Sequence, residues 1–249
     1  GVEVVAARSG VGDEVEPRGE SELVVAHGNG QHGLAGEEPA VFDVVLHLLG
    51  DEGRRLELPG ETVFAAIDDA VIDGMEMDAA PRVRITDLDE LSLYCDRVAC
   101  AVGRLCVRVF GLGEDEGIRL SAELGMALQL TNILRDIAED AGRDRVYLPA
   151  DMLAEAGAGG DGIEDVITAP ELPKLCENLA ARAETHFANA EVVIRQADPT
   201  AVRPAVMMMQ VYHRILVKLQ QRGWQNLERD VGPSKLEKIL IAIRYGVFG

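Results

Sequence analysis

The sequence predicts an all-α helical bundle over residues 61–249, preceded by an atypical acidic, Gly-rich segment over residues 1–60. From about residue 61 onward, apolar residues recur at spacings of three and four, which is the period of an α-helix. Strand signals are nearly absent after residue 60. Residues 1–60 hold 11 of the 26 glycines in the 249-residue chain and sustain no helical period.

The helices can be placed from their apolar period and from the residues that bound them. Six are expected, over residues 62–77, 87–110, 118–140, 173–196, 204–221 and 234–244. Gly111 and Gly113 end the second, and Ser234 is a plausible N-cap of the last. A loop rich in Gly and Asp covers 157–162. The period is clearest in the second helix, at Val98, Val102, Leu105, Cys106 and Val109.

The acidic composition of the chain argues against one class of partner, nucleic acid. The chain carries 24 basic and 43 acidic side chains, for a net charge of −19, which argues against nucleic acid because such binding depends on Lys and Arg contacts to phosphate. Residues 201–249 differ, with eight basic and three acidic groups. No apolar stretch reaches the roughly 18 residues of a membrane span, and the first residues show no signal-peptide pattern. We expect a cytoplasmic protein, with peripheral membrane contact left open.

The four cysteines show no paired Cys-x-x-Cys spacing. We expect reduced thiols that fill the core, rather than a disulfide or a zinc site. They are Cys95, Cys100, Cys106 and Cys176.

The side chains that predict chemistry lie in the third expected helix. Asn132, Asp136 and Asp140 are spaced four apart, so a helix places their oxygens on one stripe. Two carboxylates held this way favour a cation, and Mg²⁺ suits them because it takes one or two carboxylates and completes its shell with water and phosphate. A solvated charged face is the alternative. Three neighbouring arginines could neutralise a diphosphate, namely Arg135, Arg143 and Arg145.

Several stretches resemble the squalene/phytoene synthase family. Residues 124–149, which include Gln-Leu-Thr-Asn-Ile-Leu-Arg-Asp-Ile-Ala-Glu-Asp, are similar to its second Asp-rich motif. Residues 93–103, Leu-Tyr-Cys-Asp-Arg-Val-Ala-Cys-Ala-Val-Gly, resemble its Tyr-Cys…Val-Ala…Val-Gly helix. Residues 72–78 and 236–246 resemble more narrowly the presqualene diphosphate synthases of the hopanoid pathway. The resemblance covers about residues 62–249.

The resemblance implies an isoprenoid-synthase-like bundle around a central cavity, and a head-to-head prenyl transferase of squalene and hopanoid biosynthesis. Two farnesyl diphosphates would enter, and Mg²⁺ held by Asn132, Asp136 and Asp140 would help one diphosphate leave. The allylic cation would alkylate the second molecule, and proton loss would close the cyclopropane of presqualene diphosphate. Squalene, dehydrosqualene and phytoene remain alternative products, and the oligomeric state is not predicted.

The resemblance also assigns residue roles. Catalytic roles fall to Tyr94, Asp136 and Asp140, with Tyr94 steering or accepting the proton; a buried core tyrosine is the alternative for Tyr94. Met207, Met208 and Met209 are expected to pack the core rather than line a tunnel. Substrate binding is expected from Gln129, Asn132, Arg135, Arg145, Tyr147 and Tyr212.

The sequence departs from the family in its first quarter. The family uses two Asp-rich motifs on facing helices, but residues 1–60 contain no Asp-x-x-x-Asp. Asp69 and Asp73 have the spacing, yet Asp73 belongs to the 72–78 stretch, which has its own place in the family. A missing first motif predicts severely reduced turnover. It keeps open a second hypothesis, a non-catalytic or incomplete relative that binds isoprenoid diphosphates or a partner synthase.

One competing motif lies in the same segment. Residues 28–33 read Gly-x-Gly-x-x-Gly after a short apolar run, which is the outline of a dinucleotide-binding fingerprint. No helical pattern follows Gly33, and the rest of the chain offers no parallel strands for such a sheet. We therefore interpret the motif as a Gly-rich loop.

Overall fold

A computed structural model describes residues 69–227 and residue 231. The chain divides into two compact units, Gly1–Ala66 and Ile67–Gly249, and the described residues belong to the second. The 1–60 segment, with its glycines, and the expected helix over 234–244 lie outside the described residues.

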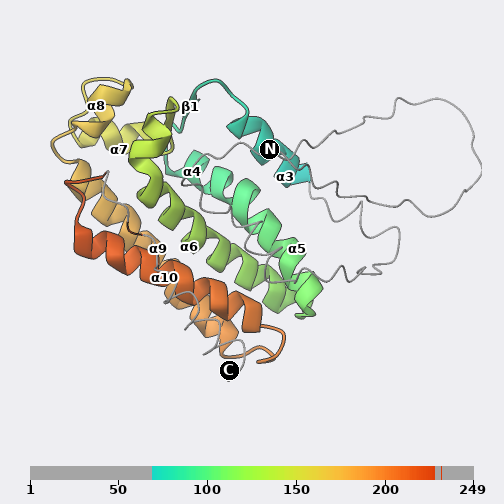
Figure 1. The fold of residues 1–249 in the computed structure, drawn as a ribbon. Helices are drawn as coiled ribbons and strands as arrows, with labels where there is room; N and C mark the ends of the chain where they lie inside the picture. Colours follow the sequence, from blue (N-terminus) through green and yellow to red (C-terminus); the bar gives the residue numbers. More distant parts are fainter. Residues whose placement is uncertain (1–68, 228–230, 232–249) are drawn as a thin grey trace, which may run out of the picture. The chain divides into compact units, whose positions relative to one another are not determined.

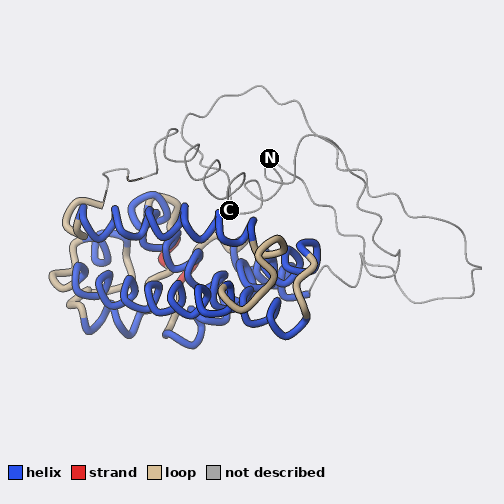
Figure 2. The backbone as a smooth tube through the Cα atoms, turned by 90° about the horizontal axis from the view of Figure 1, so that it is seen from below, coloured by secondary structure: helices blue, strands red, loops and turns tan. Residues whose placement is uncertain are grey.

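The described part is helical, which confirms the predicted fold class (Figure 1). The tube in Figure 2 shows long helices lying side by side, with only a trace of strand. The elements follow in the order α3 (Asp69–Asp78), β1 (Val83–Arg84), α4 (Leu88–Cys95), η1 (Asp96–Cys100), α5 (Ala101–Phe110), α6 (Glu114–Ala141), β2 (Arg145–Val146), α7 (Ala150–Glu155), α8 (Ile163–Ile167), α9 (Leu172–Ile194) and α10 (Arg203–Arg222).

The long helix α6 is the centre of the bundle, because α9, α5, η1 and α10 all pack against it. It begins four residues earlier than its apolar period indicated, with Gly113 at the N-cap and three acidic residues in its first turn. Those carboxylates suit the partial positive charge at a helix N-terminus, which favours the earlier start. Its interior is apolar, and Leu120 and Leu134 are fully buried.

The expected helix over 87–110 is continuous but not uniform. Asp87 caps its N-terminus by accepting a hydrogen bond from the Glu90 amide at 2.9 Å. Between α4 and α5 the chain forms the π-helical turn η1, in which the Ala101 amide donates to the Asp96 carbonyl. Gly111 ends α5 with a φ of 79°, a left-handed conformation that glycine adopts at little cost. The sequence did not indicate the π turn.

Close helix packing at η1 depends on a glycine. A Cβ added at Gly125 of α6 would lie 2.8 Å from the Cα of Cys100 and 2.9 Å from its amide nitrogen. Because backbone atoms cannot move aside cheaply, we expect Gly125→Ala to destabilise the protein by about 1–3 kcal/mol. Thermal or urea unfolding measures this. Gly113→Ala is the control, since its Cβ would meet nothing closer than a flexible Glu116 carboxylate at 3.7 Å. Equal stability of the two variants would contradict the packing.

Two short strands and two short helices were not predicted from the sequence. β1 and β2 pair in parallel, with Val83 opposite Arg145 and Arg84 opposite Val146. Strands of two residues are too short for an alternating pattern. The helices α7 and α8 flank the Gly- and Asp-rich loop over 157–162, and each holds at most six residues.

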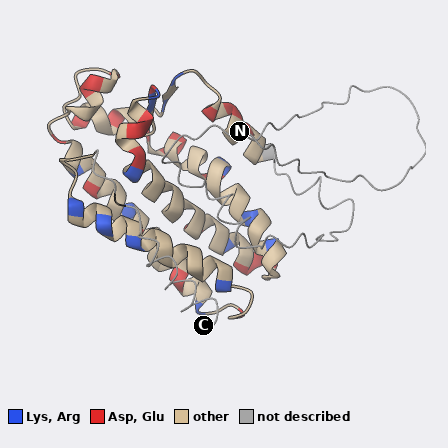
Figure 3. Ribbon diagram, in the orientation of Figure 1, with Lys and Arg blue, Asp and Glu red and all other residues tan. Residues whose placement is uncertain are grey.

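The structure has all four thiols free. Cys95, Cys100 and Cys176 are buried, as the core-filling interpretation expects, whereas Cys106 is only half-buried. Among the described residues, none of the helices combines the length and the hydropathy needed to cross a bilayer. Acidic residues gather around α7, α8 and the C-terminal end of α6, whereas basic residues run along α10 (Figure 3).

Candidate functional site

The predicted ligand stripe lies on the second half of α6. Asn132, Asp136 and Asp140 follow one another at intervals of four, and each is only partly buried. The side-chain oxygen of Asn132, however, is buried and has no hydrogen-bond partner within the described part of the chain. A buried acceptor without a donor costs about 1–3 kcal/mol, so this oxygen is suited to a ligand such as a cation.

Asp136 is held by its neighbour. The Nε and Nη2 atoms of Arg135 each lie 2.7 Å from one carboxylate oxygen of Asp136, in a two-point ion pair. Such a pair neutralises Asp136 and fixes its orientation. Arg135 and Asp136 keep 20% and 27% of their side chains exposed, so both remain within reach of a ligand.

The surroundings of Asp140 disfavour its ionised form. Burial raises the pKa of its carboxyl to about 7, and the negative charges of Asp136 and Glu139 act in the same direction. Arg143 and Arg145 oppose the increase. Asp140 also lies in the last turn of α6, where the helix dipole disfavours an anion. Burial, the neighbouring carboxylates and the helix dipole together favour a bound cation at this end of α6.

Two tyrosines meet beside this stripe. Tyr94, on α4, and Tyr147, which follows β2, are both buried, and their rings stack with centroids 4.8 Å apart. Both hydroxyls donate to the same oxygen, Oδ1 of Asp78, at 3.0 and 2.8 Å. Tyr94 also lies 3.3 Å from the other carboxylate oxygen. Asp78 is the last residue of α3, so three elements converge on one carboxylate.

Arg145 links the tyrosines to the stripe. Its Nη2 donates to the backbone carbonyl of Asp78 at 3.0 Å, and its charge lowers the pKa of Asp140. Arg84 holds this region from the opposite strand: its Nη1 donates to the Asp144 carbonyl at 2.8 Å, and its Nη2 pairs with the Asp144 carboxylate at 2.6 Å. Asp144 precedes β2 with a φ of 58°, and Arg84 stabilises that strained turn.

Within the described residues, the pocket next to Asp140 is small. A pocket of about 10 Å³, room for about one water, is lined by Asp140, Arg145 and Tyr147 together with apolar side chains. A larger groove of about 630 Å³ lies between the start of α9 and the end of α10, around Trp224, and no predicted site residue lines it.

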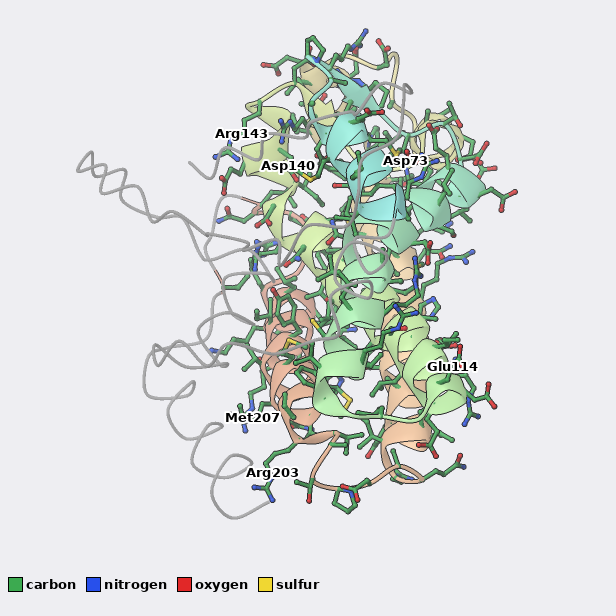
Figure 4. All side chains as sticks on the ribbon, turned by 90° about the vertical axis from the view of Figure 1, so that its right-hand side faces the viewer. Asp73, Glu114, Asp140, Arg143, Arg203 and Met207 are labelled. Carbon is green, nitrogen blue, oxygen red and sulfur yellow. The ribbon has the colours of Figure 1, made fainter. Side chains whose placement is uncertain are left out.

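The remaining predicted residues are less tightly gathered. Gln129 is half-buried on α6, one turn before Asn132. Tyr212 is buried on α10, a helix that packs against α6 and α9. Arg143 is exposed and forms an ion pair with Glu139 at 2.8 Å. Figure 4 shows Asp140, Arg143 and Asp73 at one end of the bundle and Met207 at the other. Of the three methionines, Met208 and Met209 are buried, as core packing requires, whereas Met207 is only half-buried.

Sequence reasoning missed Asp78 and Arg84 as site residues. Asp78 stood inside the 72–78 stretch but was assigned no role, because its partners are 16 and 69 residues away in the chain. Arg84 lies in a strand too short to be recognised. The only sequence signal for Asp78 was its place as one of three acidic residues in the 72–78 stretch.

The sequence matches known proteins over most of its length. The family model for squalene/phytoene synthase matches residues 36–237. The match therefore begins inside the 1–60 segment, which was expected to be atypical. A presqualene diphosphate synthase of Sinorhizobium fredii is 46% identical over 178 residues, which are 72% of this chain and 64% of that protein. The enzyme of the same name from Zymomonas mobilis is 43% identical, over 72% of this chain and 61% of that protein. This chain therefore spans less than two thirds of these relatives.

Solved structures support the fold. A dehydrosqualene synthase in complex with a ligand superposes with a TM-score of 0.60 at 22% identity, over 72% of this chain and 63% of that one. A squalene synthase from Alicyclobacillus acidocaldarius gives a TM-score of 0.55 at 25% identity, over 66% of this chain and 60% of that one. The helical bundle is thus similar to those of isoprenoid synthases.

Proposed function

Because this chain belongs to the squalene/phytoene synthase family, we propose that it joins two farnesyl diphosphates head to head to give presqualene diphosphate. The observation that carries the proposal is the stripe of Asn132, Asp136 and Asp140 at the end of α6, beside the stacked tyrosines. The names of the most similar relatives support the product.

The residues present fit Mg²⁺. Asn132 offers a buried oxygen without a donor, and Asp140 is strained as an anion next to Asp136. In the described part no three His, Cys, Asp or Glu side chains could hold a metal, but Mg²⁺ needs only one or two protein carboxylates. When bound, Mg²⁺ would supply charge stabilisation for a departing diphosphate.

Side chains around the stripe can stabilise the leaving diphosphate and the allylic cation. Arg135 and Arg145 lie beside the two carboxylates and can donate to diphosphate oxygens, which stabilises charge as it develops on the leaving group. Tyr94 and Tyr147 present stacked aromatic rings, and a ring face stabilises a nearby cation. Their burial also keeps water away from an allylic cation.

The hydrocarbon chains need an apolar surface, and η1 and α5 offer one. The apolar stripe recognised in the sequence, which starts at Val98 and ends at Val109, is only half-buried, whereas Ala99, Cys100 and Ala101 are fully buried. At about 1.5 Å per residue the stripe is about 16 Å long. Its first residue, Val98, packs against Gly74 of α3, so in this proposal an isoprenoid lies along the part from Val102 to Val109, which begins about two turns after Tyr94.

A direct assay tests the proposal. The purified protein is incubated with farnesyl diphosphate and Mg²⁺, and released diphosphate and extracted C30 products are measured. We expect one diphosphate per molecule of presqualene diphosphate. Release without any C30 product, or no release at all, would refute the proposed reaction. Supplying geranylgeranyl diphosphate in parallel separates this activity from phytoene synthesis.

A second candidate is a relative that binds isoprenoid diphosphates without turning them over. The lack of an Asp-x-x-x-Asp in residues 1–60 favours it. It predicts that a non-hydrolysable farnesyl diphosphate analogue binds with Mg²⁺ and that Asp136→Ala weakens this binding, while the assay above yields no product.

The raised pKa of Asp140 predicts that Mg²⁺ affinity depends on pH. The metal needs the carboxylate form, so its affinity should rise about tenfold between pH 6 and pH 8, because one proton of pKa about 7 must be displaced. The stability of the metal-free protein should change with pH in the opposite direction. The pKa of Asp140 in the folded protein exceeds the ordinary 3.8, so the contribution of Asp140 to the free energy of unfolding falls as pH rises from about 4 through 7. Calorimetric titration measures the first effect and thermal unfolding the second. Asp140→Asn should abolish both pH dependences; a variant that retains them points to another group.

A further inference from the structure

The carboxylate of Asp78 occupies a position that the proposed function has not used. It accepts hydrogen bonds from both tyrosine hydroxyls, and Tyr94 reaches both of its oxygens. Asp78 is only half-buried, so its carboxylate is close both to the buried pair and to solvent. The two tyrosines are also hydrogen-bonded to each other, so the carboxylate and both phenols form one network.

Tyr94 is not itself a ready base. Burial raises the pKa of its hydroxyl far above the ordinary value, and the charge of Asp78 raises it further. The side chain is therefore a neutral phenol at any physiological pH. A neutral phenol can accept a proton from a substrate carbon only if it passes its own proton to a neighbour at the same time.

We propose that Asp78 receives the proton lost when the cyclopropane ring closes, and that the Tyr94 hydroxyl transfers it. The proposal rests on the proposed function, because it requires a head-to-head condensation at this site. The electron pair of the broken C–H bond forms the last ring bond, and its proton bonds to the Tyr94 oxygen. The hydroxyl proton of Tyr94 moves to an Asp78 oxygen over about 3 Å. Asp78 ends as a neutral carboxylic acid, and Tyr94 is again a neutral phenol.

Tyr147 and Arg145 are positioning residues in this scheme. Tyr147 donates to the same Asp78 oxygen at 2.8 Å and stacks on the Tyr94 ring, which fixes the angle between hydroxyl and carboxylate. Arg145 holds the backbone carbonyl of Asp78 at 3.0 Å, which secures the end of α3. Its contact is with the backbone and does not depend on the Asp78 side chain.

The test is the ratio of released diphosphate to cyclopropyl product. Asp78→Asn keeps the size of the side chain but removes the proton acceptor. Departure of diphosphate should continue, while the coupled cation, unable to lose its proton, is captured by water as an alcohol that lacks the cyclopropane ring. We expect the ratio to rise from one in the wild type to about ten or more, and Tyr94→Phe to produce the same change. The double variant should be no worse than either single one, because the two residues act in one relay.

Asp73→Asn is the matched control for loosening of α3. Asp73 lies on the same helix and pairs with Arg97 of η1 at 3.0 Å, away from the tyrosine hydroxyls. Its loss should lower diphosphate release and product formation in the same proportion and leave the ratio at one. A ratio of one in Asp78→Asn, even with slow turnover, would overturn the relay and point to the released diphosphate as the proton acceptor.

A measurement without turnover separates this inference from the proposed function. The chain has four tyrosines, so ¹³C labelling at the phenol carbon gives four signals. Asp78→Asn should shift two of them, those of Tyr94 and Tyr147. If the wild type forms no product but two signals shift, the proposed reaction fails and the hydrogen-bond network stands. If no signal shifts, the network on which the relay depends is refuted.

Discussion

Asp136→Asn is expected to lower kcat/KM for farnesyl diphosphate by roughly 10³-fold or more. The substitution keeps the shape of the side chain but removes a negative charge from the stripe. It also removes the charge of the carboxylate whose two oxygens each lie 2.7 Å from the Arg135 guanidinium. Steady-state assay of diphosphate release at saturating Mg²⁺ measures the effect.

The control for this variant lies on the same helix. Asp115→Asn removes an exposed carboxylate from the first turn of α6, at the end away from the stripe. We expect it to change kcat/KM by less than about twofold. If Asp136→Asn retained a tenth or more of wild-type activity, Asp136 could not be an essential part of the site.

Arg145→Gln has the second largest expected effect, a loss of about 10²-fold in kcat/KM. The side chain joins both halves of the site, since it donates to the Asp78 carbonyl and counteracts the raised pKa of Asp140. Glutamine preserves the backbone pairing of β2 with β1 and removes the charge. The pKa of Asp140 should rise further, so the loss should be greater at pH 6 than at pH 8.

An exposed arginine on another helix provides the comparison. Arg182→Gln on α9 removes the same charge from a residue whose Nε bonds to Asn178, one turn away. It should leave activity and its pH profile unchanged. If the two variants behaved alike, the effect of Arg145 would reflect overall charge rather than its place beside Asp140.

The sequence placed Asn132, Asp136 and Asp140 on one stripe of α6, because the interval of four between them is a local property of one helix. The long helices were also recognisable, since each buries one periodic face. The end of α6 and the glycine stop of α5 followed from residues that act within one turn.

The features that could not be predicted depend on distant contacts. The π turn at η1 inserts a residue without a sequence signal, and its packing against Gly125 of α6 appears only in three dimensions. The β1–β2 pair joins residues more than 60 positions apart. Asp78 became a candidate only because Tyr94 and Tyr147 converge on it.

Metal binding by the α6 stripe is the central claim, and Mn²⁺ in place of Mg²⁺ makes it directly measurable. Electron paramagnetic resonance counts free Mn²⁺ as protein is added in the presence of a non-hydrolysable farnesyl diphosphate analogue. We predict that the wild type and Asp115→Asn take up Mn²⁺ and that Asp136→Asn and Asp140→Asn take up at least tenfold less. Equal uptake by all four proteins would contradict the claim that Asn132, Asp136 and Asp140 hold the metal.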